Sequence, residues 1–375
     1  MKRIRSIRSR AAAHWLKDEA AGQRRRYRGL VAAQGALAPR RERWIAQFLE
    51  RVEARGCPVD DPALRKLPLE EARSRRRRRL RVVSRKAAVA RPHIEGYVGL
   101  RAPWKKMPLP GFPKGMHYQL LSLDTDSGAC SLKVRFESGF RLPGGFSNSE
   151  MELFVLSGSL LLGEARHGPG SYLFVPAGVV LPALSAPNGA QVLQYYNGGE
   201  PSFVASDSDH PDAERDQLVA VDAYATPDWR PDDSRPAAAP DRLVKLLRRD
   251  PATGACTFLC CVPPHFRQGG INYHDCATET YQISGTTWTM QFGDLPPGGY
   301  CWRPAYLNYG PFASRRGALS LGRSDAELNN NFHFDPRTTA EANRAQAARR
   351  LQRHKPELYA AIAARARTRR PRGRV

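Results

Sequence analysis

An internal duplication constrains the fold of this 375-residue chain more than any other feature. The segment "SGACSLKVRFESGFRLPGG", which begins at Ser127, aligns with "TGACTFLCCVPPHFRQGG", which begins at Thr253, at an offset of 126 residues. Two more segments recur in the same order, pairing Glu152 with Glu279 at an offset of 127 and Pro176 with Pro304 at 128. A repeat of this length indicates that a whole domain was duplicated.

Both copies consist of short runs of β-forming residues broken by Gly and Pro. The first copy contains "HYQLLSLD", "CSLKVRFE" and "MELFVLSGSLLLG", and the second contains "TFLCCVPP", "ETYQISGTTWTMQFG" and "GYCWRPAY". Many short strands at regular spacing, separated by turn residues, predict an antiparallel sandwich or barrel. We therefore expect an all-β core of two tandem barrels.

The basic residues are concentrated outside this core. Residues 1–92 carry 27 Lys and Arg against 9 Asp and Glu, a net charge of +18, and residues 336–375 carry 12 against 2, a net charge of +10. Because the whole chain has a net charge of +23, residues 93–335 carry −5. The predicted parts are a basic helical extension at 1–92, a first barrel at 93–200, a linker at 201–240, a second barrel at 241–335 and a basic helical tail at 336–375.

Arg-rich blocks at 73–81 and 365–374 would attract phosphate backbones without sequence specificity. Neither block is accompanied by a recognised nucleic-acid-binding motif, so a solvated or partner-docking extension is favoured and nucleic-acid binding stays the alternative. The sequence has no run of about 18 apolar residues and so predicts no membrane span. Seven cysteines without a repeated spaced pair are expected to be reduced thiols, which fits a cytoplasmic protein.

In their order and spacing the repeated motifs resemble the cupin superfamily in its two-barrel, or bicupin, form. Three segments, "RLVKLLRRDPATGA", "HDCATETYQISG" and "YCWRPAYLNYGPF", are most similar to the cupin domain of certain zinc-dependent anti-sigma factors and of related uncharacterised bicupins. The resemblance implies two jelly-roll barrels, each with a first motif of two His and a Glu and a later motif with one His. In such barrels imidazoles and a carboxylate converge on a metal ion.

The second barrel keeps part of this ligand set. His274 falls at the second His position and Glu279 at the Glu position, while Asn272 and Tyr309 take the places of the other two His. The implied site either holds one divalent or ferric metal (iron, zinc, nickel or copper) through these four residues, or is a metal-free pocket. In the metal-free case Glu279 or Tyr309 would act as an acid or base. Cys276 is a further candidate ligand, as a thiolate.

The first barrel keeps fewer ligand-type residues. Glu152 remains, but Ser147 and Asn148 stand at the imidazole positions and Leu181 at the later His position. Because leucine cannot coordinate a metal, this barrel is expected to be a structural or dimerisation partner. Glu152 would then be a carboxylate at the barrel mouth that is satisfied by hydrogen bonds.

The predicted function is binding of a small organic molecule in the second barrel. Four aromatic residues are expected to line that pocket, although they can equally belong to the barrel core: Tyr281, Trp288, Trp302 and Tyr306. With a metal, the resemblance implies an oxygenase or dioxygenase; without one, the site would suit a lyase or isomerase. The alternative is a non-catalytic sensor or scaffold whose basic ends bind nucleic acid or an acidic protein. A homodimer is compatible with both.

Overall fold

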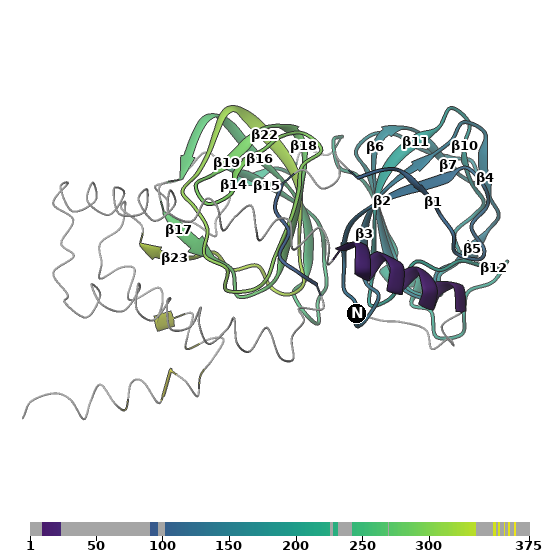
Figure 1. Ribbon diagram of the computed structural model, residues 1–375, viewed down its shortest axis with the longest axis horizontal. Helices are drawn as coiled ribbons and strands as arrows, with labels where there is room; N and C mark the ends of the chain where they lie inside the picture. Colours follow the sequence, from purple (N-terminus) through teal and green to yellow (C-terminus); the bar gives the residue numbers. More distant parts are fainter. Residues whose placement is uncertain are drawn as a thin grey trace, which may run out of the picture.

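Figure 1 shows the computed structural model, in which two β-rich units lie side by side. The structure describes residues 10–23, 91–96, 102–225, 228–231, 242–268 and 270–334, with a few positions between 348 and 364. The predicted all-β core is confirmed. Most of the two predicted basic extensions, including both Arg-rich blocks, lies outside the described residues. Within the described part, no helix combines the length and apolar content needed to cross a bilayer.

Unit 1, residues 102–222, contains the first thirteen strands and the short 3-10 helix η1 (Arg215–Gln217). Its strands are β1 (Lys105–Lys106), β2 (Met116–Leu123), β3 (Cys130–Phe136), β4 (Phe140–Leu142), β5 (Gly145–Phe146), β6 (Glu150–Gly158), β7 (Leu160–Leu162), β8 (Ala165–His167), β9 (Ser171–Val175), β10 (Leu184–Ala186), β11 (Ala190–Asn197), β12 (Val204–Ala205) and β13 (Val219–Asp222).

Two sheets enclose the core of unit 1. The larger has the order β1-β2-β3-β11-β6-β9-β13, and the smaller has the order β4-β10-β7-β8. Strands β12 and β13 fall within the predicted linker, but they pair with β5 and β9 and therefore belong to unit 1. Non-sequential neighbours such as β3 and β11 are typical of the jelly-roll topology.

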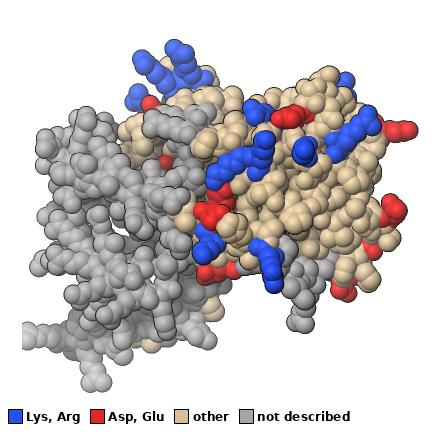
Figure 2. All heavy atoms as spheres, turned by 45° about the vertical axis from the view of Figure 1, so that its right-hand side comes forward, with Lys and Arg blue, Asp and Glu red and all other residues tan. Residues whose placement is uncertain are grey.

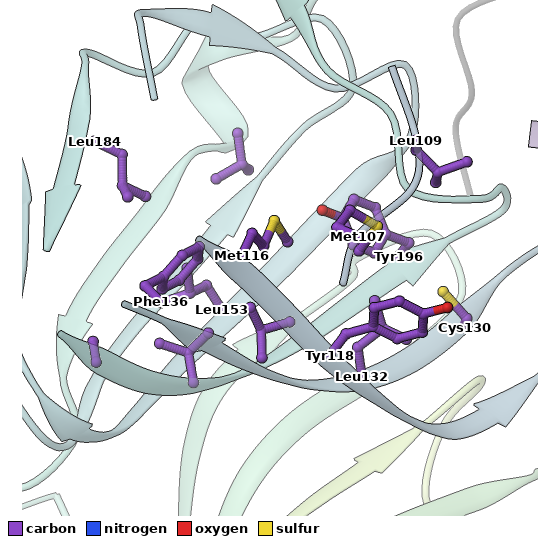
Figure 3. Close-up of a cluster of buried hydrophobic side chains, with 14 of the residues drawn as sticks. Met107, Leu109, Met116, Tyr118, Cys130, Leu132, Phe136, Leu153, Leu184 and Tyr196 are labelled. Atoms are coloured by element: carbon purple, nitrogen blue, oxygen red, sulfur yellow. The ribbon is translucent and has the colours of Figure 1, made fainter. Parts of the chain in front are cut away.

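The interior of unit 1 is lined by buried apolar side chains, several of which Figure 3 labels. Because side chains alternate across a strand, Leu153 and Val155 of β6 face this interior while Glu152 and Phe154 face the opposite side. Helix 10–23 adds Trp15 to the same cluster. Its indole N–H donates to the Tyr118 hydroxyl at 3.0 Å, so the helix docks through both apolar and polar contacts.

Unit 2, residues 228–334, contains the remaining ten described strands. They are β14 (Arg230–Pro231), β15 (Leu243–Arg249), β16 (Cys256–Gln268), β17 (Ile271–Tyr273), β18 (Thr278–Gly285), β19 (Thr287–Thr289), β20 (Gly293–Leu295), β21 (Tyr300–Arg303), β22 (Phe312–Ser324) and β23 (Asn331–Phe334).

The main sheet of unit 2 has the order β14-β15-β16-β22-β18-β21. The run β15-β16-β22-β18-β21 repeats the run β2-β3-β11-β6-β9 of unit 1 strand for strand, as a duplication requires. Strand β22 is long enough to pair with β16, β18 and β19, so one continuous sheet curls around the interior. The edge strand β21 also pairs with Ile94, which precedes unit 1 in the sequence.

On the face shown in Figure 2, Lys and Arg side chains are interspersed with Asp and Glu over the described residues. Opposite charges alternate on that face and do not form one continuous basic surface.

Candidate functional site

Isolated backbone bridges show which positions of the two units correspond. Gly145 bridges Leu181 in unit 1, and Asn272 bridges Tyr309 in unit 2. The offsets of 127 and 128 residues agree with the alignment of the repeats. Tyr309 therefore stands where unit 1 has Leu181, and Asn272 where unit 1 has Gly145.

His274 and Tyr309 form a close polar pair in unit 2. His274 Nε2 lies 2.5 Å from the Tyr309 hydroxyl, and His274 Nδ1 lies 2.8 Å from the carbonyl oxygen of Asn329. A carbonyl can only accept, so Nδ1 carries a proton, and in the neutral ring Nε2 is left as the acceptor. The Tyr309 hydroxyl accordingly donates to His274.

Asn272 completes this group. Its side chain is hydrogen bonded to Tyr309, and its Oδ1 accepts a bond of 3.3 Å from Gln268 Nε2. The structure thus brings together three of the four predicted ligands, His274, Tyr309 and Asn272, and all three are buried or nearly so.

A buried cation lies against the Tyr309 ring. The Arg303 guanidinium carbon is 4.1 Å from the ring centroid of Tyr309 and 5.2 Å from that of Phe292. Arg303 Nε donates to Glu95 Oε1 at 2.5 Å and its Nη2 to Glu95 Oε2 at 3.1 Å. His93 Nε2 lies 2.9 Å from the same Glu95 carboxylate, so the segment 91–96 contributes two side chains to this region.

Burial raises the pKa of Tyr309, and the Arg303 charge and the Asn272 hydrogen bond offset part of that increase. Burial also opposes the charge of Arg303, but neighbouring Cys301 and Glu95 raise its pKa overall, so Arg303 stays cationic. Burial would raise the pKa of Glu95 as well, yet Arg303 and His93 lower it, so Glu95 stays ionised. The phenol of Tyr309 therefore lies beside a stable ion pair.

Glu279 is not part of this group, and its predicted role as a metal ligand or catalytic acid or base does not fit the structure. Its carboxylate accepts hydrogen bonds from Ser131 Oγ at 2.5 Å and Tyr300 Oη at 2.6 Å, and it forms ion pairs with Arg91 and Arg323. The physical reason is strand alternation: Glu279 and Tyr281 face unit 1, while Thr278 and Thr280 face the other way.

The two repeated glutamates, Glu152 and Glu279, have equivalent hydrogen-bond donors in the inter-unit interface. Glu152 accepts a hydrogen bond from its own unit's Tyr172 at 2.8 Å and from Thr257 of unit 2, as Glu279 does from Tyr300 and from Ser131 of unit 1. These donors correspond in the alignment, so the units pack with approximate twofold symmetry. The predicted hydrogen bonds to Glu152 are confirmed, but the predicted place at the barrel mouth is wrong, because the carboxylate faces Thr257 and Arg323 of unit 2.

Arg323 breaks this symmetry and holds both carboxylates. It donates to Glu152 at 2.6 Å, to Glu279, and to Asn197 at 2.7 Å, while its guanidinium stacks over the Tyr195 ring. Burial would raise the pKa of Glu152, but Arg323 and the hydrogen bonds lower it to about 2. Permanently ionised and enclosed, these glutamates cannot exchange protons with a ligand near neutral pH.

The four predicted pocket-lining aromatics lie in three places. Tyr281 and Trp302 belong to the cluster between the units, and Trp302 lies 5.5 Å beneath Arg91. Trp288 lies in β19, opposite Asp294 and Ala313 in the sheet register.

Tyr306 lies beside the His274 pair. Its backbone N–H donates to the His274 carbonyl at 2.8 Å, as Gly178 donates to Ser147 at 2.8 Å in unit 1. Ser147 is therefore the counterpart of His274. The Tyr306 ring is 45% exposed, and its centroid lies 6.2 Å from that of Tyr273.

Each of the six cysteines that the structure describes is a free thiol. Burial and, to a smaller extent, nearby Asp325 together raise the pKa of the Cys276 thiol to about 12. Cys276 is therefore a neutral thiol at ordinary pH, and as it stands it does not provide a thiolate ligand.

The donors near His274 do not fit the predicted metal site. Without Glu279, the set consists of one imidazole nitrogen, one phenol oxygen and one amide oxygen, and the imidazole nitrogen is already bonded to the phenol. Among the described residues, no three His, Cys, Asp or Glu side chains gather as metal ligands. A carboxylate normally supplies the charge that a divalent ion requires, and here it is held by two arginines.

The interiors of the two units differ systematically. Inward positions correspond at offsets of 127 or 128 residues: Leu153 to Thr280, Val155 to Gln282, Leu160 to Thr287, Leu162 to Thr289 and Ala186 to Ser314. The amides and hydroxyls of unit 2 form hydrogen bonds with one another and with the backbone. For example, Gln282 Oε1 accepts a hydrogen bond from the Thr287 hydroxyl at 3.2 Å. Unit 2 is thus polar at these positions, where unit 1 has an apolar core, and among its described residues the remaining apolar cluster is the small one of Val262, Phe266 and Ala318.

Sequence reasoning missed Arg303, His93 and Glu95. The alignment contained a signal for the first: Arg303 of "YCWRPAY" pairs with Val175 of "YLFVPAG" at an inward position. A charged residue at a position that is apolar in the sister repeat indicates a changed interior. No local signal marked His93 or Glu95, because they reach unit 2 only through long-range strand pairing.

Several solved structures have a similar fold. A proposed dioxygenase from Nostoc punctiforme aligns with a TM-score of 0.57 and 24% identity, over 63% of this chain and 83% of that chain. Oxalate decarboxylase from Bacillus subtilis aligns with a TM-score of 0.44 and 10% identity, over 64% of this chain and 80% of that chain. A search of curated proteins found no match.

The likeness to the Nostoc protein shows a shared fold. A family model described as a domain of unknown function (DUF4437) matches residues 103–331, which extend from just before β1 to the start of β23. This match spans both units and more than half of the sequence, and the chain therefore belongs to the DUF4437 family.

Proposed function

We propose that unit 2 binds a small polar organic molecule in its interior and transfers a proton to or from it through Tyr309 and His274. The observation that carries the proposal is the hydrogen-bonded His274–Tyr309 pair, in a unit that has polar side chains at several inward positions where unit 1 has apolar ones. Polar side chains contribute less burial energy than the apolar ones they replace. Their concentration in one interior supports a binding role.

The geometry supports a defined proton route. Tyr309 gives its proton to His274 Nε2, and the resulting phenolate takes a proton from the ligand. Arg303 and Asn272 stabilise the phenolate charge, and the Nδ1–H of the imidazolium remains bonded to the Asn329 carbonyl. Return of the proton to another atom of the ligand gives an isomerase; return to a leaving group gives a lyase.

Ligand capture tests the proposal. Full-length protein is dialysed against a mixture of polar metabolites in deuterated water, and the retained compounds are identified by mass spectrometry. We expect Tyr309→Phe and His274→Gln to weaken retention about tenfold or more, since hydrogen bonds to charged groups contribute roughly 1.5–3 kcal/mol. Ser147→Ala, at the unit 1 counterpart of His274, should retain the same compounds as the wild type.

Deuterium separates catalysis from binding. Proton transfer predicts that a retained compound gains deuterium with the wild type and not with Tyr309→Phe. Retention without exchange would favour the non-catalytic sensor, and retention that survives both unit 2 substitutions would refute a ligand site at this pair.

A metal-dependent oxygenase is the second candidate, suggested by the name of the Nostoc relative as a proposed dioxygenase. At 24% identity the likeness establishes the fold alone, and the donor set near His274 gives this candidate no additional support. The finer similarity to cupins of zinc-dependent anti-sigma factors also stays a prediction. Elemental analysis of the purified protein distinguishes the two candidates. We expect well under one metal ion per chain if the site works by proton transfer alone. About one ion per chain, lost in His274→Ala, would establish the oxygenase-type site.

A further inference from the structure

The edge strand β21 of unit 2 pairs with a segment that precedes unit 1 in the sequence. Ile94 N–H donates to the Trp302 carbonyl at 2.9 Å, Trp302 N–H donates back to Ile94 at 2.9 Å, and Tyr300 N–H donates to Gly96 at 2.9 Å. In unit 1 the corresponding edge, β9, pairs with β13, which belongs to that same unit. The chain therefore crosses from unit 2 into unit 1 and returns.

The segment 91–96 is fixed at the inter-unit interface. Arg91 donates to Ser122 at 2.6 Å and to Ser131 at 2.5 Å, both in unit 1, and forms an ion pair with Glu279 of unit 2. Ile94 is buried in the cluster between the units. These contacts hold the backbone that presents His93 and Glu95 to unit 2.

We propose that Glu95 is a positioning residue of the unit 2 site, which holds the Arg303 guanidinium against the Tyr309 ring. Both Arg303 bonds to Glu95 come from one side of the guanidinium, while the Tyr309 and Phe292 rings lie against it. The inference rests on the proposed function, because it assigns Glu95 a role in setting the acidity of the phenol that transfers the proton.

Few other charged groups act on Tyr309. Those that face it among the described residues are His274, Arg303, Arg242 and Cys301, with Glu95 and His93 behind Arg303. Among these charges, Arg303 lowers the pKa of Tyr309 the most. Its position is therefore the variable that a change in Glu95 would alter.

The direction of the effect distinguishes positioning from simple charge. If Glu95 acted only as a negative charge, Glu95→Gln would lower the pKa of Tyr309, because a nearby anion disfavours a phenolate. If Glu95 positions Arg303, Glu95→Gln lets the Arg303 guanidinium move away from the Tyr309 ring. The pKa of Tyr309 then rises, as it would in Arg303→Met. The two explanations predict opposite signs.

The test replaces Tyr309 with difluorotyrosine in the full-length chain and follows its fluorine NMR signal against pH. Ring fluorines make the phenol more acidic, so the titration falls in a range where the fold is retained, and the signal reports this position alone. We expect Arg303→Met to raise the midpoint by about one pH unit or more, since an adjacent opposite charge shifts a pKa by roughly 1–3 units. Glu95→Gln should shift it in the same direction, and Arg303→Lys should restore part of the shift.

Asp209→Asn is the matched control, since it removes a carboxylate from an exposed arginine pair in unit 1 and should leave the midpoint unchanged. An unchanged or lowered midpoint in Glu95→Gln would overturn the proposal. If that variant does not fold, Glu95→Asp shortens the carboxylate arm and should still raise the midpoint; no rise would count against positioning. The titration needs no ligand, so its failure is distinguishable from failure of the ligand-capture experiment.

Discussion

Unit 1 and unit 2 share their central strand order but fill their interiors in opposite ways. In unit 1 the interior is an apolar cluster that Trp15 of helix 10–23 extends from outside the barrel sequence. In unit 2 several of the corresponding positions carry amides and hydroxyls, and the same unit contains the His274–Tyr309 pair. The difference teaches that one strand framework accommodates either apolar packing or hydrogen-bonded polar side chains at the same inward positions.

What the two units keep in common lies between them. Each contributes one buried glutamate, one tyrosine and one hydroxyl donor to the inter-unit interface, in corresponding positions. The repeated Glu152 and Glu279 are therefore shared because both units need the interface, and the resemblance to a metal-binding motif does not explain them.

The largest expected effect comes from Arg323→Met, which leaves two carboxylates buried without their shared cation. Removal of one partner from a buried ion pair costs about 3–5 kcal/mol. Urea unfolding of the full-length chain measures the change. Arg215→Met, which breaks a pair whose arginine is 56% exposed, should cost less than about 1 kcal/mol. Equal losses in the two variants would contradict a buried ionic interface.

Stability should also fall in acid because of the same interface. Folding lowers the pKa of Glu152 from 4.5 to about 2, so this carboxylate stabilises the fold fully above pH 4.5, and the contribution is lost as pH falls from 4.5 towards 2. A shift of this size corresponds to roughly 3 kcal/mol. Unfolding free energies at pH 6, 4 and 3 measure the loss, and Glu152→Gln should show a shallower dependence on pH. Identical dependence in both proteins would rule Glu152 out as the source.

Much of the fold followed from the sequence, because the repeats fixed both the number of units and the correspondence of their strands. His274 and Tyr309 followed from the same alignment. Glu279 was assigned to the wrong face because β18 is buried on both sides, so its residues show no clear polar and apolar alternation. Glu95 could not be found, since pairing of 91–96 with β21 spans about two hundred residues and leaves no local pattern.

Exchanging one inward residue between the units tests the contrast directly. Val155→Gln places an amide among leucines that offer it no hydrogen bond, which should cost about 1–3 kcal/mol. The reciprocal Gln282→Val should cost less, because the interior of unit 2 has other polar groups that can rebond. Thermal unfolding of the two variants gives the comparison, and an equal or larger loss for Gln282→Val would show that the two interiors are energetically alike.

The smallest expected effect concerns the turn beside His274. Gly178 occupies it in unit 1 with φ of 76°, and Tyr306 occupies it in unit 2 with φ of 64°. A side chain costs about 1–2 kcal/mol in this left-handed region, and glycine loses roughly 0.5–1 kcal/mol more entropy on folding. Tyr306→Gly should therefore stabilise the protein by up to about 1 kcal/mol while weakening ligand capture, if the exposed ring contacts the ligand.

His265 supplies the control, because it is also left-handed, with φ of 62°, and aligns with Gly139 of unit 1. His265→Gly should give a similar gain in stability and leave ligand capture unchanged. Tyr306→Phe should keep both the strain and most of the capture. If Tyr306→Gly leaves ligand capture unchanged, the left-handed tyrosine has no role in binding. If Tyr306→Gly weakens capture while it raises stability, the backbone strain at this turn is linked to binding.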